Sequence, residues 1–570
     1  MGRALLVSFA GYPYTPSSLM PDNGLASLAG ALADAGHEVR ILDYGTVSTL
    51  DRLFPPRLSR AVRPLARRLF CSERSLSWLQ KMRFLYSAWR LERHQQREMA
   101  AIAEEVAAEA EAFGAQLVGL KLWNGDGFAG SVRIAEAIRE FRPETFVVGG
   151  GPQVDYFRRH VLDYTTAFDA VVAGEGERVL PRLFDAMTAG AKWRGMPGVI
   201  YRDAERVRGA RAEALDDLAE LPLPLYDEQV YPALHSGEKI NIGVVDESRG
   251  CPNRCAFCIH PIKSGRHWCV KPAGRVVAEM RRLMQTANTR YFIYSGSNTS
   301  ARVALGIARR IVEEGLDVRY GCFGHVRGIG RADFDLLRRS GCEAIFYGLE
   351  SASPRVLREG FNKPLDLDQA ERVIRQTGRA GICAITSVIY PGPFEDEQSR
   401  AQTLQFLRSV RPDSVPVTIP GMIPGTPWER QPDKYGFEKL DREDIWEYAL
   451  TYKIKLLYPP SMWKPLPYRL NGKSSRQLLR ECEQFVGDLE ESGLLTNVPH
   501  EMVLMADAMG MRDDLRGFRN RCRADFLSGN VESVDQMVRT INENVALRGG
   551  ARAPAGAGAF ADSDIITIAR

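Results

Sequence analysis

The sequence predicts an α/β protein with two parallel sheets, because hydrophobic strands alternate with amphipathic helices in two separate series along the chain. A proline-rich stretch at residues 213–235 divides the two series, and paired prolines interrupt both helices and sheets. After about residue 430 the pattern becomes mostly helical. At roughly 150 residues per domain, 570 residues allow two to four domains.

The composition excludes several broad classes of protein. The chain has 75 Lys and Arg against 71 Asp and Glu, a net charge of +4 that is too small for an extended nucleic-acid surface, so no nucleic-acid partner is expected. No run of 18 apolar residues is present, and the apolar start lacks a small-residue cleavage site. Ten cysteines, three of them within eight positions, indicate a metal site in a reducing compartment, so a cytoplasmic location is expected.

The first series predicts a Rossmann-like, doubly wound domain over residues 1–212. Its strands and helices should follow one another as strand 4–10, helix 23–35, strand 37–42, strand 116–121, helix 129–141, strand 145–148 and strand 170–173. Glycine-rich segments follow the last two strands. In such folds ligands bind at the carboxyl ends of the strands, so we expect a binding site there.

A basic helical insertion at residues 46–112 interrupts this domain. Within residues 52–97 twelve Lys and Arg stand against two acids, Glu73 and Glu92, and aromatic side chains are interleaved with the basic ones. A basic amphipathic helix can lie on an anionic membrane, so peripheral membrane contact through residues 52–97 is one interpretation. The preferred alternative is a helical insertion that packs on the first domain and turns a basic face to solvent.

The second series predicts a partial (β/α)6 barrel over residues 236–428. Its expected strands are 240–246, 291–294, 318–321, 344–348, 382–390 and 414–419, with helices between them. An active site in such a barrel lies at the carboxyl ends of the strands. Residues 429–548 should form a mostly helical C-terminal domain, and the Ala- and Gly-rich stretch at 549–570 should be disordered.

Three cysteines follow the first strand of the predicted barrel. Cys251, Cys255 and Cys258 have C-x3-C-x2-C spacing, and three thiolates on one loop can hold three irons of a [4Fe-4S] cluster with the fourth iron open. The alternative is zinc, with His260 as a fourth ligand. The cluster is favoured because zinc knuckles usually form small modules of their own.

With Phe257 before the third cysteine, this segment resembles the radical S-adenosylmethionine (SAM) superfamily, in which SAM chelates the open iron and is cleaved to a radical. On that resemblance the three cysteines are the cluster ligands. Segments after later strands, at residues 348–351 and 390–393, match the family's SAM contacts in order along the chain. The segment at 294–298 departs from the acidic version common in relatives, and its Ser295, Ser297 and Asn298 offer hydrogen bonds instead. The resemblance therefore implies a SAM site formed by Phe257, Ser295, Ser297, Glu350, Ser351 and Gly392.

The barrel preceded by a doubly wound domain resembles the cobalamin-binding subfamily of these enzymes. The chain lacks the D-x-H-x-x-G segment that supplies a histidine to cobalt in many cobalamin proteins, so His37 and His160 are not expected as ligands. Trp123, after the strand at 116–121, is the candidate beneath the corrin, and a core tryptophan is the alternative. The resemblance implies cobalamin contacts at Trp123, Gly149, Gly150, Gly151, Pro152, Gly174, Glu175 and Gly176.

The implied activity is transfer of a methyl group from SAM, by way of methylcobalamin, to an unactivated carbon of a natural product, peptide or lipid. The expected partners are a small-molecule or peptide substrate and an electron donor such as flavodoxin or ferredoxin. Two alternatives stay open: a cobalamin-dependent radical SAM cyclase or rearrangement enzyme, and a non-enzymatic cobalamin sensor with a zinc site.

Overall fold

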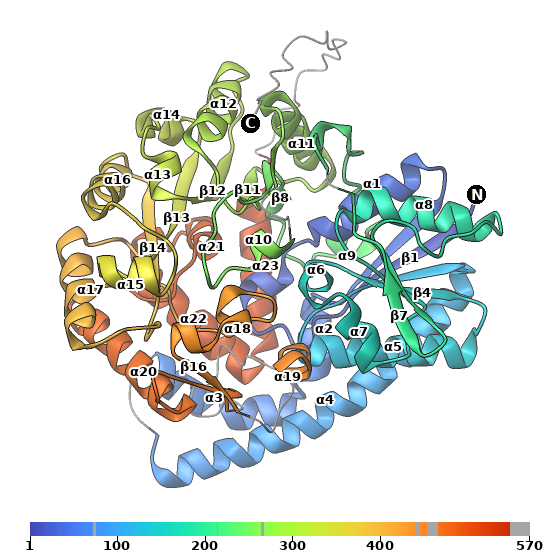
Figure 1. The fold of residues 1–570 in the computed structure, drawn as a ribbon, viewed down its shortest axis with the longest axis horizontal. Coiled ribbons are helices and arrows are strands. Elements are labelled where there is room, and N and C mark those ends of the chain that lie inside the picture. Colours follow the sequence, from blue (N-terminus) through green and yellow to red (C-terminus); the bar gives the residue numbers. More distant parts are fainter. Residues whose placement is uncertain (72–75, 214, 264–266, 441–444, 453–464, 548–570) are drawn as a thin grey trace.

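Two parallel sheets lie side by side in the computed structural model, one in the N-terminal part and one in the second series (Figure 1). The structure describes residues 1–71, 76–213, 215–263, 267–440, 445–452 and 465–547, so the predicted disordered tail at 549–570 lies outside the described residues. Among the helices in those ranges, none is long and apolar enough to cross a membrane.

The N-terminal sheet has the order β2-β1-β3-β4-β5-β6-β7, and its first five strands are parallel. Leu5 and Val7 of β1 face the core beneath α4 and α5, whereas Leu6 faces the core beneath α1 and α8, so helices cover both faces as predicted. The antiparallel pair β6 and β7 at one edge was not predicted. The strands are β1 (Arg3–Ser8), β2 (Glu38–Asp43), β3 (Leu117–Lys121), β4 (Phe146–Gly150), β5 (Ala170–Val172), β6 (Val199–Asp203) and β7 (Arg206–Gly209), and the helices are α1 (Asn23–Asp34), α5 (Asp126–Phe141), α6 (Val154–Phe157), α7 (Arg159–Tyr164) and α8 (Gly176–Thr188).

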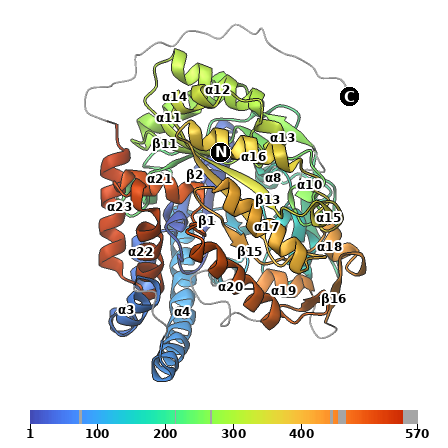
Figure 2. The ribbon, with the colours of Figure 1, turned by 90° about the vertical axis from the view of Figure 1, so that its left-hand side faces the viewer.

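The insertion is helical, with α2 (Val47–Leu53), α3 (Pro56–Phe70) and α4 (Trp78–Phe113). The 36-residue α4 begins with a capping box at Ser77 and ends at Gly114, whose φ of +67° suits a left-handed C-cap. The later part of α4 packs on α5, while its beginning extends beyond the body of the molecule (Figure 2).

The second sheet has six parallel strands in the order β15-β14-β13-β12-β11-β8, which confirms the predicted open barrel. Strand β9 follows β8 and pairs antiparallel with β10, and the cysteine segment lies in the connection between these two strands; the pair was not predicted. The strands are β8 (Gly243–Val245), β9 (Ser248–Gly250), β10 (Trp268–Val270), β11 (Tyr291–Tyr294), β12 (Arg319–Gly324), β13 (Cys342–Glu350), β14 (Cys383–Ile389) and β15 (Val417–Thr418). The helices of this part are α9 (Pro232–His235), α10 (His260–Lys263), α11 (Ala273–Thr286), α12 (Ala301–Glu313), α13 (Val326–Ile329), α14 (Phe334–Arg339), α15 (Pro354–Glu359), α16 (Leu367–Arg379) and α17 (Glu397–Val410).

The C-terminal helices share their core with both sheets. Helix α21 packs on β12 and β13 from the side opposite α12 and α16, α22 packs on α3, and α23 packs on α2. The Tyr12 hydroxyl donates to the carbonyl oxygen of Phe526 at 2.7 Å, and Asn542 donates to the carbonyl of Lys239 at 2.8 Å. These contacts tie the two sheets together. The remaining elements are α18 (Pro427–Arg430), β16 (Phe437–Lys439), α19 (Ile445–Thr451), β17 (Tyr468–Leu470), α20 (Ser475–Glu491), α21 (His500–Ala508), α22 (Leu515–Ser528) and α23 (Val531–Val545).

Candidate functional site

A cavity of about 800 Å³ lies where the carboxyl ends of the two sheets meet. One wall comes from the loops after β1, β3, β4 and β5, and the other comes from the segments after β8 and β11 together with α10. The volume is in the range of small-molecule and cofactor pockets, and the position is the one expected for ligands of open α/β sheets.

The eight residues predicted to contact cobalamin all line this cavity. A Cβ atom added at Gly150 would lie 3.9 Å from its nearest neighbour, so the wall is open at that position. Gly174 has a φ of +86°, and its backbone N–H donates to Asp155 Oδ1 at 2.6 Å. Glycine backbone leaves room for close approach of a large planar ligand, so the glycine segments of this wall fit a corrin ring.

Trp123 lies on the same wall in a fixed orientation. Its indole Nε1 donates to the hydroxyl of Ser8 at 3.2 Å, and the ammonium of Lys121 lies 4.4 Å from the centre of one of its rings. Lys121 is held in turn by an ion pair with Asp22 at 2.7 Å. Indole cannot readily ligate a metal, so this side chain offers a bulky surface and no ligand.

The histidines discussed from the sequence do not lie on that wall. His37 is buried against Phe184 and accepts a hydrogen bond from the backbone of Gly2, and His160 stacks on Trp446 at 3.9 Å. Among the described lining residues the one histidine is His260, which belongs to the opposite wall.

The cysteine segment follows β9 at the edge of the cavity. Gly250 and His260, on its two sides, line the cavity, whereas Cys251, Cys255 and Cys258 are not among the described lining residues. Cys251 is buried and accepts a hydrogen bond from Asn253 Nδ2 at 3.4 Å.

Burial and nearby charges both change the pKa values of these thiols. Burial raises the pKa of Cys255, and the ammonium of Lys363 opposes that rise. Burial also raises the pKa of Cys258 to about 12, and the other two thiols add to the rise because they are close. Thiols in this setting ionise when a metal takes the proton's place, so the donor set suits an iron–sulfur cluster. No three His, Cys, Asp or Glu side chains in the described ranges are grouped to hold a single metal ion.

An ion network joins the cysteine segment to the glycine wall. Arg249, two residues before Cys251, contacts Glu175 at 2.5 Å and Glu177 at 2.7 Å on the N-terminal side. It also contacts Asp246 of its own wall at 2.6 Å. Sequence reasoning did not find this network; the only signal was that Arg249 lies next to the Gly250–Cys251 pair.

The predicted SAM residues separate into two groups. Ser295 and Ser297 line the cavity; Ser295 donates to Asp246, and the hydroxyl of Ser297 lies 2.8 Å from Nδ1 of His260. The other four are not among the described lining residues: Phe257, which belongs to the cysteine segment itself, and Glu350, Ser351 and Gly392, which follow later strands.

The second group is held by protein contacts. Phe257 packs edge-on against Phe361 with ring centres 5.6 Å apart. Glu350 is in the left-handed region, with a φ of +68°, and pairs with buried Lys363 at 2.8 Å. Ser351 is fully buried and donates to Glu395 at 3.0 Å. In this structure the hydroxyl of Ser351 is therefore directed toward Glu395, and Glu350 is linked to the thiols through Lys363.

Sequence and fold comparisons agree with this two-part architecture. The model of the Radical SAM superfamily matches residues 248–407, and the model of the B12 binding domain matches residues 91–184. The radical SAM methyltransferase TsrM of Kitasatospora setae, solved with cobalamin and a [4Fe-4S] cluster bound, has the same fold with a TM-score of 0.63. It is 16% identical, and the match covers 94% of this chain and 99% of that one.

Curated relatives include enzymes of more than one reaction type. An uncharacterized methyltransferase of Pyrococcus horikoshii is 28% identical over 327 residues, which is 57% of this chain and 67% of that protein. The hopanoid C-3 methylase of Methylococcus capsulatus is 24% identical, over 52% of this chain and 56% of that protein. The anaerobic magnesium-protoporphyrin IX monomethyl ester cyclase of Rubrivivax gelatinosus is 23% identical, over 58% of this chain and 60% of that protein. The matches thus span from just over half to two thirds of these relatives.

Proposed function

We propose that this chain, which has a B12-binding domain and a radical SAM domain, transfers a methyl group from SAM, through cobalamin, to an unactivated carbon of an organic small molecule. The observation that carries the proposal is the shared cavity, in which the glycine wall and the segments beside the cysteines face each other. A substrate held between these walls would lie within reach of both the radical derived from SAM and the methyl group carried by cobalamin.

When bound, the cluster with SAM supplies a carbon radical and the cobalamin supplies the methyl group. In our proposal Cys251, Cys255 and Cys258 hold the cluster, and the ammonium of Lys363 offsets part of its negative charge. Arg249 holds this segment against Glu175 and Glu177, so the distance between the two binding walls is fixed. Fixed placement of reacting groups in a closed cavity is the contribution that the protein makes to such a reaction.

Side chains on the two walls have different proposed roles. Ser295 and Ser297 present hydroxyls to the cavity and are proposed to bind SAM by hydrogen bonds. Trp123 is proposed to lie under the corrin and to exclude water without ligating the metal. The electron that starts the reaction is proposed to come from a small donor protein such as flavodoxin or ferredoxin.

The test is product analysis after anaerobic reconstitution with iron, sulfide, cobalamin and SAM. Each turnover should consume two SAM, with one molecule each of S-adenosylhomocysteine and 5′-deoxyadenosine formed, and methyl-labelled SAM should label the product. Iron bound in a ratio of about four per chain supports the enzyme, whereas one zinc per chain supports the sensor alternative.

Ring closure is the second candidate, because the relatives of this chain include a cyclase with a match of similar extent. The same experiment separates the two reactions. Deoxyadenosine formed without transfer of the labelled methyl group would favour the cyclase, and transfer without deoxyadenosine would favour a polar methylation.

A further inference from the structure

The beginning of α4 carries an unusual concentration of exposed apolar side chains. Eleven large hydrophobic side chains are exposed in the described part of the chain, and six of these fall within twelve residues of α4. Their exposed fractions are between 46% and 71%. The six are Trp78, Leu79, Met82, Leu85, Tyr86 and Trp89. We call residues 76–93 the α4 arm.

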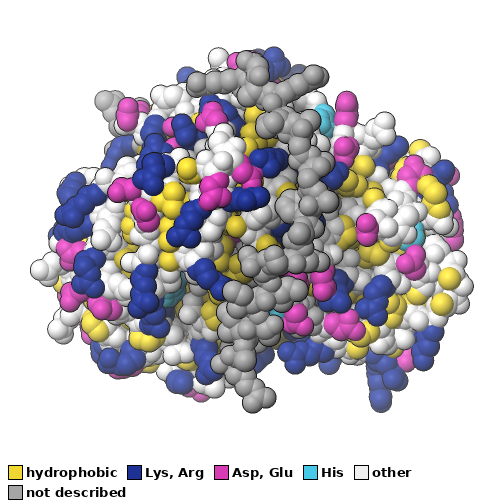
Figure 3. Space-filling view, turned by 90° about the horizontal axis from the view of Figure 1, so that it is seen from above, with side chains coloured by type: hydrophobic (Ala, Val, Ile, Leu, Met, Phe, Trp, Pro, Cys, Tyr) yellow, Lys and Arg dark blue, Asp and Glu magenta, His cyan; other side chains and the backbone are white. Residues whose placement is uncertain are grey.

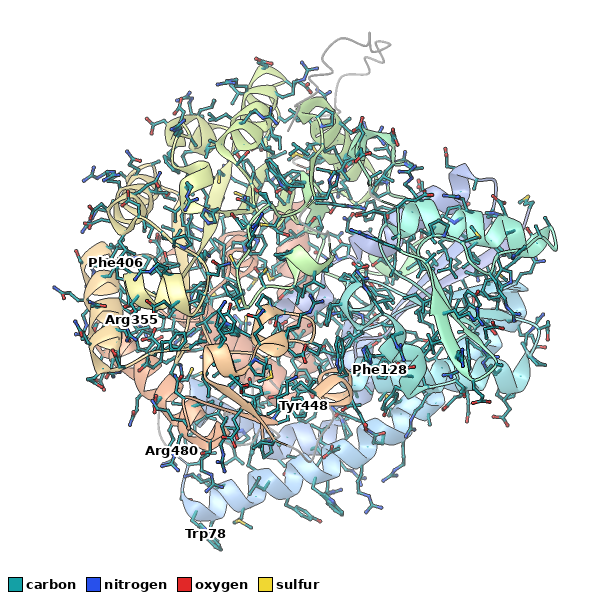
Figure 4. The ribbon with its side chains drawn as sticks, in the orientation of Figure 1. Trp78, Phe128, Arg355, Phe406, Tyr448 and Arg480 are labelled. Atoms are coloured by element: carbon teal, nitrogen blue, oxygen red, sulfur yellow. The ribbon has the colours of Figure 1, made fainter. Side chains whose placement is uncertain are left out.

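These six side chains form one stripe. At about 100° of rotation per residue, all six lie within roughly 120° of the helix circumference. Phe84 and Leu91 on the opposite side are buried in the protein core. The arm therefore already buries one apolar face in the fold and presents a second one to solvent. Trp78 lies at the free end of the helix and points away from the body (Figure 4).

Basic side chains flank the stripe. Residues 76–97 contain five Lys and Arg and one acid, Glu92, and the neighbouring α3 has five Arg and no acid. Two of the arginines lie over stripe aromatics, with Arg93 at 5.0 Å from the Trp89 ring centre and Arg90 at 5.9 Å from that of Tyr86. On the face shown in Figure 3, by contrast, Lys and Arg are interspersed with Asp and Glu.

We propose that the α4 arm docks this protein on an anionic lipid membrane. Trp and Tyr favour the headgroup region, Leu and Met suit the acyl boundary, and Lys and Arg gain attraction from acidic lipids. A second copy of the chain is a poorer partner, because pairing two arms would bring their basic flanks together. The proposal is independent of the reaction assigned to the cavity.

The test is flotation of the full-length protein with vesicles of equal parts phosphatidylcholine and phosphatidylglycerol. Binding should be strong to these vesicles and weak to phosphatidylcholine alone. Replacement of both stripe tryptophans, Trp78→Ser with Trp89→Ser, should lower the partition coefficient roughly tenfold or more. Arg83→Glu with Arg90→Glu should lower it by a similar factor on the anionic vesicles.

A matched control tests the specificity of the surface. Phe141 on α5 and Val312 on α12 are exposed apolar residues outside the arm, and replacing both with Ser should leave flotation unchanged. All variants should keep the far-ultraviolet circular dichroism of the parent, because the stripe makes up an exposed face. Flotation that the arm variants leave unchanged would overturn the proposal. The proposal would also be overturned if sedimentation velocity showed a dimer that depends on the arm while the protein did not bind vesicles.

Discussion

The N-terminal sheet and the second sheet present their carboxyl edges to one cavity, yet they form its two walls in different ways. The N-terminal wall includes open glycine backbone, at Gly149–Gly151 and around Gly174, beside larger side chains such as Trp123. The other part of the site contains buried ionisable side chains, in the ion pair Lys363–Glu350 and in the carboxyl groups of Glu247 and Glu395. One side thus offers space for a large ligand, while the other surrounds the thiols with buried ionisable groups.

The first prediction tests whether the cluster and cobalamin bind independently on the two walls, and we expect the greatest change here. Cys255→Ala should remove the cluster and all SAM cleavage, because a cubane needs its three thiolates, while cobalamin binding on the opposite wall stays intact. Iron and sulfide analysis and cobalamin absorbance measure the two outcomes. Cys482→Ala, in the buried face of α20, is the control and should retain its iron. If the Cys255 variant lost both cofactors, the two walls would not be separable.

The next effect tests the connection between the walls. Arg249→Met leaves Glu175, Glu177 and Asp246 without their shared cation and should lower the free energy of unfolding by about 3 kcal/mol. Urea denaturation followed by circular dichroism measures the change. Arg182→Met, which breaks an exposed pair with Glu213, should cost less than about 1 kcal/mol. Equal effects from the two variants would contradict a special role for Arg249.

A third prediction concerns the open space on the glycine wall. Gly150 has ordinary backbone angles and room for a side chain, so Gly150→Leu should fold and fill part of the cavity. Its cobalamin affinity should fall by about 10- to 100-fold, while the content of cluster iron stays normal. Equilibrium titration with cobalamin checks this. Gly378→Ala, in open space on α16, is the control and should change neither the cobalamin affinity nor the iron content. An unaltered cobalamin affinity in Gly150→Leu would show that cobalamin does not bind at this wall.

The last prediction concerns the protonation of Glu395 and its small contribution to the pH dependence of stability. Burial raises the pKa of Glu395 to about 7 from an ordinary value of 4.5. The folded protein therefore holds a proton that the unfolded chain releases, and the stability falls as the pH rises toward the raised value. Between about pH 6 and pH 8 the loss should be about 1 kcal/mol. Glu395→Gln should remove this part of the pH dependence of the free energy of unfolding, measured by urea denaturation. If the variant and the parent had the same pH profile, Glu395 would be ionised throughout this range.

Much of the fold was predictable because hydrophobic alternation and turn residues act locally. The six parallel strands of the second sheet and the helical insertion were found in this way. The antiparallel pair β6 and β7 was missed because its strands are short and β7 is largely exposed, so alternation is weak there. The glycine segments after β4 and β5 were predicted to form one site, and they line the same cavity.

The amino-acid sequence contains the residue types and spacings on which the chemistry depends: three cysteines within eight positions, two α/β series and glycines at strand ends. Which side chains meet across long separations depends on the packed fold. Arg249 reaches Glu175 over 74 residues, and Tyr12 reaches Phe526 over 514. Strand and helix patterns arise from neighbours along the chain, whereas these ion pairs and the cavity exist only because whole sheets pack together.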